Sequence, residues 1–263
     1  MDLSIAAILA QDGVTSGAIY ALLALALVLV FSVTRVIFIP QGEFVAYGAL
    51  TLAAIQANKA PLSASMLVAL GVLTFLVEMG RTLLQPELRL HALRTGAIYA
   101  GKYLLFPLAV FAAANVLAPM TLPQPVQVAL ALLIVIPMGP MIYRLAYEPL
   151  AEASTLVLLI VSVGVHFAMV GLGLVMFGAE GSRTDAFSDA RFDLGALSVS
   201  GQSLWVVAVS ALMIMALYFY FGRTVSGKAL RATAVNRLGA RLVGIGTTQA
   251  GRLAFTLAAA LGA

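Results

Sequence analysis

Long apolar runs separated by short polar segments dominate the pattern along this 263-residue chain. A helix needs about 20 apolar residues to cross the hydrocarbon layer of a bilayer. By this measure the pattern predicts an all-α, polytopic transmembrane bundle with about seven complete spans and an eighth that starts near residue 248. The seven runs lie at 14–33, 42–57, 61–79, 100–118, 126–146, 154–177 and 203–222.

Two of these runs differ from the others. Residues 42–57 form a short run that begins after Pro40, which indicates a tilted or partly re-entrant segment. The eighth run, LAFTLAAALGA, reaches the last residue without a polar flank. We therefore expect a single transmembrane domain over 1–263 that is C-terminally incomplete.

The composition places this domain in lipid rather than in water. Hydrophobic residues make up 62% of the chain and charged residues 10%, against roughly 25% charged in a typical globular domain. The net charge of +4 is small and shows no basic face with interleaved aromatic residues, which argues against nucleic-acid binding. The absence of cysteine excludes disulfides and thiolate metal sites. We predict no catalytic residues and no metal ligands.

Loop charge predicts the orientation of the spans, because Lys and Arg accumulate on the cytoplasmic side. The loop 80–99 contains Arg81, Arg89 and Arg94, and the segment 223–252 contains six basic residues and no acidic one. Both are expected inside. The loop 178–202 is richer in acidic, Gly and Ser residues, so we expect an ordered external loop and an external N-terminus.

The cytoplasmic segment carries a helical pattern of its own. Its apolar residues recur every three or four positions, which predicts one apolar stripe along a helix. Arg231 and Arg241 interrupt the edges of that stripe, as suits a helix docked on protein better than one lying flat on acyl chains. The stripe consists of Leu230, Ala234, Leu238, Leu242 and Ile245.

Glycines mark the limits of this helical pattern. Gly227 precedes it and Gly244 follows it, while Asn236 and Gly239 permit a local break. The alternative interpretation is a juxtamembrane basic segment that enforces topology and contacts anionic lipid.

Few ionisable residues fall near the predicted membrane. Such residues are functional candidates by default, because an unpaired charge in lipid is costly. Glu43 opens the second run, eight residues after Arg35, and His166 lies in the middle of the sixth. The alternatives are an interfacial anchor for Glu43 and a buried, hydrogen-bonded packing residue for His166. Ser16 and Tyr20 are further residues that could face a pathway.

Three blocks of the sequence resemble the branched-chain amino acid ABC transporter permease family. GKALRATAVNRLGARLVGIGTTQAGRLAFTLAAALGA is similar to the family's cytoplasmic loop, approximately G-R-A-x-R-A-x-A and then A-x-L-x-G-I. GAIYALLALALVLVFSVTRVIFIPQGEFVAYGAL resembles S-I-Y-A-L-x-A-x-G-L followed by I-N-F-A-H-G-E. YRLAYEPLAEASTLVLLIVSVGVHF is similar to E-R-x-x-Y-R-P-L and the span after it. Together the blocks cover over half of the chain in family order.

The chain departs from the family at three places. Phe38 and Gln41, with Pro40 between them, stand where the family has asparagine and histidine, and Glu148 replaces the arginine of Y-R-P-L. Residues 61–118 have no recognised counterpart and are expected to be a two-span insertion.

The resemblance implies an importer subunit of the bacterial inner membrane, the shorter of two paired permeases. Its implied partners are a second homologous permease, two cytoplasmic ATP-binding subunits and a periplasmic solute-binding protein. No cofactor is implied on this chain, since ATP and Mg²⁺ would bind the ATPases. The implied solutes are branched-chain amino acids or related small polar molecules.

Segment 223–247 would then be the cytoplasmic coupling loop, in which small residues permit close approach and Arg231 and Arg237 pair with acidic groups of the ATPase. The coupling residues implied are Gly227, Lys228, Ala229, Arg231, Ala232, Ala234, Asn236, Arg237, Ala240, Leu242, Gly244 and Ile245. The substrate-pathway candidates are Ser16, Tyr20, Gln41, Gly42, Glu43 and His166.

Two other functional classes stay open. A secondary transporter or channel would need intramembrane ionisable residues, and inverted repeats would favour it, but the sequence shows no clear repeat. An intramembrane enzyme is disfavoured, because the chain has no G-x-S-x-G or H-E-x-x-H motif and its two histidines, His91 and His166, are far apart. The chain also has no Walker A loop, so ATP would be hydrolysed on a partner.

Overall fold

The protein is helical along most of its length, as the apolar runs predict. The structure, a computed structural model, describes residues 3–84, 92–188, 190–194 and 197–263. Within these residues, six helices are long and apolar enough to cross a membrane, and they lie at Ile5–Thr34, Leu62–Leu84, Gly96–Leu117, Gln124–Leu150, Thr155–Phe177 and Gly201–Arg223. The chain is therefore a multi-pass membrane protein with an all-α bundle.

The elements follow one another with short connections. The first half of the chain comprises α1 (Leu3–Thr34), α2 (Gln41–Gln56), α3 (Leu62–Leu84), α5 (Ala92–Ala100), η1 (Gly101–Leu105) and α6 (Phe106–Leu117). The centre comprises α7 (Gln124–Val135), α8 (Met138–Ile142), η2 (Tyr143–Tyr147), η3 (Glu148–Leu150) and α9 (Thr155–Phe177). The last part comprises β1 (Arg191–Leu194), β2 (Leu197–Ser200), α10 (Gly201–Arg223), α11 (Val225–Val235), α12 (Arg237–Leu242) and α13 (Thr247–Gly262).

The second and eighth predicted spans correspond to α2 and α13, which are shorter than the other six. Each has 16 residues. At a rise of 1.5 Å per residue such a helix is about 24 Å long, below the roughly 30 Å of the hydrocarbon layer. Asn58, with a φ of 56°, and Pro61 end the α2 region before it can lengthen. The predicted count of seven complete spans is therefore not confirmed. Among the described residues six helices are long enough to span, and the other predicted span corresponds to the short α2.

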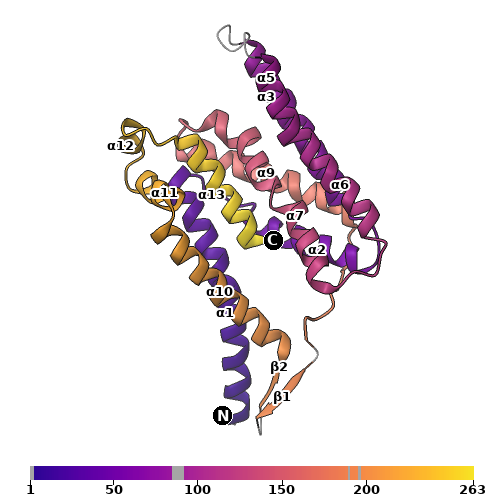
Figure 1. The fold of residues 1–263 in the computed structure, drawn as a ribbon. Helices are drawn as coiled ribbons and strands as arrows, with labels where there is room; N and C mark the ends of the chain where they lie inside the picture. Colours follow the sequence, from indigo (N-terminus) through magenta and orange to yellow (C-terminus); the bar gives the residue numbers. More distant parts are fainter. Residues whose placement is uncertain (1–2, 85–91, 189, 195–196) are drawn as a thin grey trace.

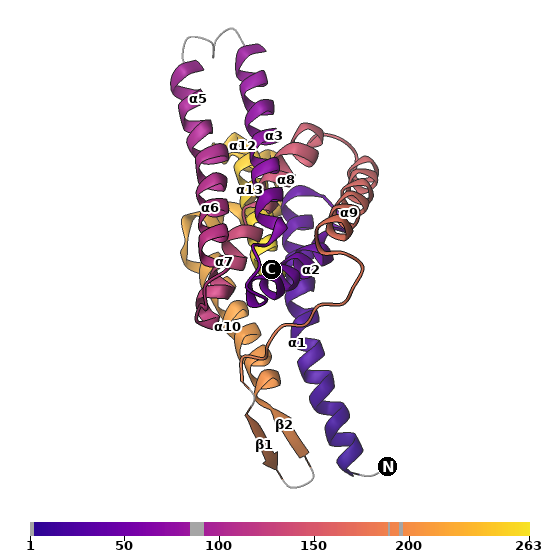
Figure 2. The same ribbon diagram turned by 90° about the vertical axis from the view of Figure 1, so that its right-hand side faces the viewer.

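The loops predicted to be external and those predicted to be cytoplasmic lie towards opposite ends of the molecule. Figures 1 and 2 show the N-terminus and the β1–β2 hairpin at one end, and α11, α12 and the adjoining ends of α3 and α5 towards the other. The hairpin pairs antiparallel from Arg191 with Ser200 to Leu194 with Leu197, which gives order to the predicted external loop. Arg89, in the predicted inside loop, lies outside the described residues.

An aromatic cluster forms the centre of the bundle, where α2, η2 and α13 meet. Phe255 of α13 lies 4.7 Å from Phe38, 4.8 Å from Tyr143 and 5.2 Å from Tyr147, measured between ring centroids. All four side chains are almost completely buried. Edge-to-face and tilted aromatic pairs contribute about 0.5–1.5 kcal/mol each beyond their burial. Phe38 is therefore a packing residue.

Small residues and interhelical hydrogen bonds bring the helices together, as they do in lipid, where no hydrophobic force drives association. A Cβ added at Gly139 of α8 would lie 2.6 Å from the carbonyl oxygen of Phe255, so only glycine permits this approach. The hydroxyl groups of Thr51 in α2 and Ser63 in α3 lie 2.7 Å apart. This close packing fixes the relative positions of the helices that carry the charged side chains.

Two wide helical turns interrupt the regular α-helices of the bundle. η1 and η2 are π-helical, a rare form that often occurs at functional sites. η1 contains Lys102, and η2 contains Arg144. Each cation therefore lies on an irregular turn within a membrane-spanning helix.

Candidate functional site

The segment after α10 forms two short helices rather than one. The hydroxyl of Thr224 accepts a hydrogen bond from the backbone N–H of Gly227 at 3.0 Å and caps α11. A Cβ at Gly227 would collide with the backbone of Tyr220, so the turn requires glycine. Asn236 leaves the helix with φ −150° and ψ 98°, and its Oδ1 accepts a hydrogen bond from Gly239 at 2.9 Å. The break predicted at Asn236 is confirmed.

The break divides the predicted apolar stripe. Leu230 is 1% exposed and packs against the bundle, whereas Leu238 and Leu242 are 69% and 81% exposed. A continuous stripe over 227–245 was therefore the wrong expectation, because the Asn236 cap redirects the chain and turns α12 outward. Gly244 follows α12 with a φ of 85°, a conformation that favours glycine, and confirms the predicted boundary.

A shallow groove of about 660 Å³ runs between α11 and α12. Its lining combines cationic, small and apolar side chains. Five of the predicted coupling residues line it, namely Lys228, Arg231, Ala232, Asn236 and Ala240. Three others, Ala229, Gly244 and Ile245, line a neighbouring cavity of about 240 Å³. The predicted coupling residues therefore line two cavities beside the elbow, which we define as α11 and α12 together.

α12 is fastened to the turn between η3 and α9. Arg237 donates from Nη1 to the carbonyl oxygen of Ala151 at 3.1 Å, and Arg241 donates to the carboxylate of Glu152. That hydrogen bond and the charge of Arg241 lower the pKa of Glu152. Arg237 thus has a partner within its own chain, where the sequence suggested an acidic group of an ATPase. Lys228 and Arg231 are exposed and have no ion pair among the described residues.

A second candidate site lies between α2 and α9, where the side chains of Glu43 and His166 are 13% and 32% exposed. Nδ1 of His166 lies 2.7 Å from Oε1 of Glu43, an ion pair whenever the imidazole is protonated. The hydroxyl of Tyr47 donates to the carbonyl oxygen of Met169 at 2.8 Å and holds the two helices together beside this pair. Oε2 of Glu43 is buried and has no hydrogen-bond partner among the described residues. The site thus offers an unoccupied acceptor.

The other predicted pathway residues have different positions. Gln41 is 2% exposed and donates to the carbonyl oxygen of Ala258 at 2.9 Å, so it ties α2 to α13. A Cβ at Gly42 would meet no atom within 4 Å, which places this backbone beside open space. Ser16 and Tyr20 are exposed on α1, and Tyr20 is 69% exposed. Of the six candidates, the structure brings Glu43 and His166 into direct contact.

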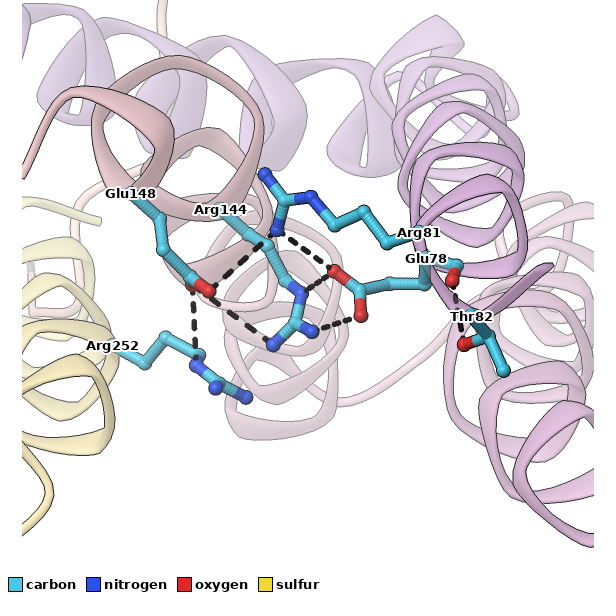
Figure 3. A network of polar contacts seen from close by, with 6 residues as sticks. All are labelled: Glu78, Arg81, Thr82, Arg144, Glu148 and Arg252. Atoms are coloured by element: carbon cyan, nitrogen blue, oxygen red, sulfur yellow. Dashed lines mark hydrogen bonds and ion pairs between the residues drawn. The ribbon is translucent and has the colours of Figure 1, made fainter. Parts of the chain in front are cut away.

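Sequence reasoning missed a buried cluster of charges, drawn in Figure 3. Arg144 of η2 forms a two-pronged ion pair with the carboxylate of Glu78 in α3. Their side chains are 7% and 4% exposed. The sequence did contain a signal for this pair. Glu78 falls inside the predicted span 61–79 and Arg144 inside 126–146, and a charged residue inside a span needs a partner.

The cluster extends to three further side chains. Glu148 lies 3.9 Å from Arg144, 3.7 Å from Arg81 and 3.5 Å from Arg252, so it links η3 to α3 and α13 (Figure 3). Arg81 also lies 3.4 Å from Glu78. Three arginines therefore surround the carboxylate of Glu148.

The described residues contain no group of three or more His, Asp or Glu side chains that could hold a metal ion. Comparisons of the chain with family models, curated proteins and solved structures found no match.

Proposed function

We propose that this chain is a permease subunit of an ATP-driven importer in the bacterial inner membrane. One observation carries the proposal: the elbow is fastened at one side and exposes a mixed basic and apolar face at the other. Val235, Leu238, Leu242 and Val243 are 69–86% exposed beyond the ends of the membrane helices. Contiguous exposed apolar side chains rimmed by charge are typical of a protein interface.

The elbow is suited to transmit movement. Leu230 and Thr233 of α11 are buried in the bundle, and α12 is bound to the turn at Ala151 and Glu152. A force applied to the elbow by an ATPase subunit therefore reaches α9 through this turn. α9 carries His166, which contacts Glu43. We infer a path from the nucleotide-dependent partner to the candidate pathway site.

The solute proposed is a branched-chain amino acid or a related small polar molecule. The buried Oε2 of Glu43 can accept a hydrogen bond from an ammonium or amide group, and the open space beside Gly42 leaves room for one. The second permease, the two ATPases and the solute-binding protein are the remaining proposed partners.

Replacement of Ala232 by tryptophan tests the proposal. Ala232 is exposed in the groove, so the larger side chain fits without disturbing the bundle but blocks a docked subunit. We expect loss of ATP-dependent uptake and loss of a photo-crosslink from position 238 to a protein that carries a Walker A motif. Ala60→Trp, at an exposed loop position just before α3, is the matched control. This variant should retain both the uptake and the crosslink. Normal uptake by Ala232→Trp at normal expression would refute the proposal.

A secondary transporter is the second candidate function, and the Glu43–His166 pair favours it. Ionisable pairs inside a membrane domain often serve as proton relays. Purified protein in liposomes, supplied with a proton gradient and no ATP, distinguishes the two. Uptake under those conditions would support the secondary transporter and exclude the importer.

A further inference from the structure

A groove separate from the elbow and the Glu43–His166 site lies between η1 and α6, α8 and α13. Its volume is about 810 Å³, within the range of small-molecule and lipid-headgroup sites. Lys102 and Arg252 are its two cationic side chains, and Gln249 and Thr256 add polar atoms. The remaining lining is apolar or aromatic, including Phe106, and so suits an amphiphile rather than a free polar solute.

The charges around this groove do not balance. Within the described part of the chain, Arg81, Arg144, Arg252 and Lys102 have two carboxylates near them, those of Glu78 and Glu148, which leaves an excess of two positive charges among these six side chains. A cluster placed in lipid needs compensation, because unpaired charges there are costly.

The excess is concentrated on the two groove residues. Arg252 has one ion pair among the described residues, in which its buried Nε lies 3.5 Å from Oε2 of Glu148 without forming a hydrogen bond. Lys102 is exposed and has no ion pair among the described residues. Its ammonium nitrogen lies 5.4 Å from the centroid of the Tyr103 ring, a cation–π contact. Two cations therefore line one opening.

We propose that this groove binds an anionic phospholipid, whose phosphate lies between Lys102 and Arg252 and whose acyl chains follow the exposed face of α6. Leu105 at the end of η1 and Phe106 at the start of α6 are 69% and 39% exposed, so the start of this helix is open to lipid. α5, which leads into η1, and α12, which precedes α13, lie towards the end of the bundle that the charge pattern predicts to be cytoplasmic, the side whose leaflet is rich in anionic lipid (Figure 2). Basic pockets between membrane helices on this side commonly bind acidic headgroups. The proposal does not depend on the transport function.

Lys102→Gln is the primary test, because Lys102 is exposed and its loss breaks no ion pair. We titrate the delipidated full chain in non-ionic detergent with phosphatidylglycerol, phosphatidylcholine or inorganic phosphate and measure bound ligand by native mass spectrometry. We expect phosphatidylglycerol to bind at least about fivefold more tightly than phosphatidylcholine, and Lys102→Gln to lose about fivefold. Lys102→Arg should retain the preference. Arg94→Gln, an exposed cation two turns away on the same helical segment, is the matched control and should also retain it.

A second measurement leaves Lys102 intact. Trp205 is the only native tryptophan, so the double variant Trp205→Phe/Phe106→Trp places a single reporter at the groove. Brominated phosphatidylglycerol should quench its fluorescence more strongly than brominated phosphatidylcholine. Equal quenching, equal binding of the two lipids, tight binding of inorganic phosphate alone, or an equal loss in Arg94→Gln would each overturn the proposal.

Discussion

The buried pair between Glu78 and Arg144 allows the energetics of the bundle to be tested quantitatively. Each residue lies on a different helix, and their side chains are 4% and 7% exposed. Removing one member of such a pair leaves an uncompensated buried charge and costs about 3–5 kcal/mol. The perturbation is a double-mutant cycle of Glu78→Met, Arg144→Met and both together.

The neighbouring charges set the magnitude. After Arg144→Met, Glu78 keeps Arg81 at 3.4 Å, and after Glu78→Met, Arg144 keeps Glu148 at 3.9 Å. We therefore expect the low end of the range, about 3 kcal/mol of destabilisation for each single variant. The double variant removes both charges together with their desolvation penalty and should lose about 3 kcal/mol or less in total. The coupling energy is then about 3 kcal/mol.

The assay is equilibrium unfolding by SDS in mixed micelles, followed by far-UV circular dichroism. The exposed pair of Arg241 and Glu152 is the matched control, because water screens it and such pairs contribute little. Its cycle should show a much smaller coupling than that of Glu78 and Arg144. Additive effects at Glu78 and Arg144, with a double variant destabilised by about 6 kcal/mol, would refute the reasoning that the two charges stabilise each other.

Two further predictions concern helix packing and pH. Gly139→Val places a Cβ 2.6 Å from a backbone oxygen of α13, so we expect a loss of about 1–3 kcal/mol in the same unfolding assay, and wild-type stability would contradict the packing argument. The pKa of Glu152 is lowered in the folded state, so its contribution to docking α12 is complete above its unfolded pKa of about 4.5 and is lost as the pH falls through the folded pKa. A nitroxide label at Leu242 should therefore become more mobile at about pH 3 than at pH 7, whereas Glu152→Gln should be equally mobile at both; a pH-independent wild type would contradict this.

The parts of the fold that the sequence predicted are those set by neighbouring residues, such as apolar runs and helix caps. The predicted spans 154–177 and 203–222 agree closely with α9 and α10, because Ser154 and Ser200 cap these helices and mark where the apolar runs begin. The break at Asn236 was equally local, since the capping side chain lies three residues from the N–H that it accepts. Local chemistry did not predict that the elbow would turn Leu230 inward and Leu242 outward, because that depends on the bundle against which α11 packs.

The candidate site was predicted only in its parts. Glu43 and His166 each stood out as an ionisable residue near apolar sequence, but they are separated by more than a hundred positions, and only the packing of α2 on α9 makes them partners. Glu78 and Arg144 lie 66 positions apart, so their pairing likewise depends on how α3 packs against η2.

The amino-acid sequence by itself therefore determined that this chain is helical, embedded in a membrane and basic at one end, because span length and capping depend on neighbouring residues. Tertiary structure alone decided which charges neutralise one another, which cations are left in excess, and which face of the elbow is exposed. Those outcomes depend on contacts between distant helices, where a shift of a few ångströms separates an ion pair from an unpaired charge.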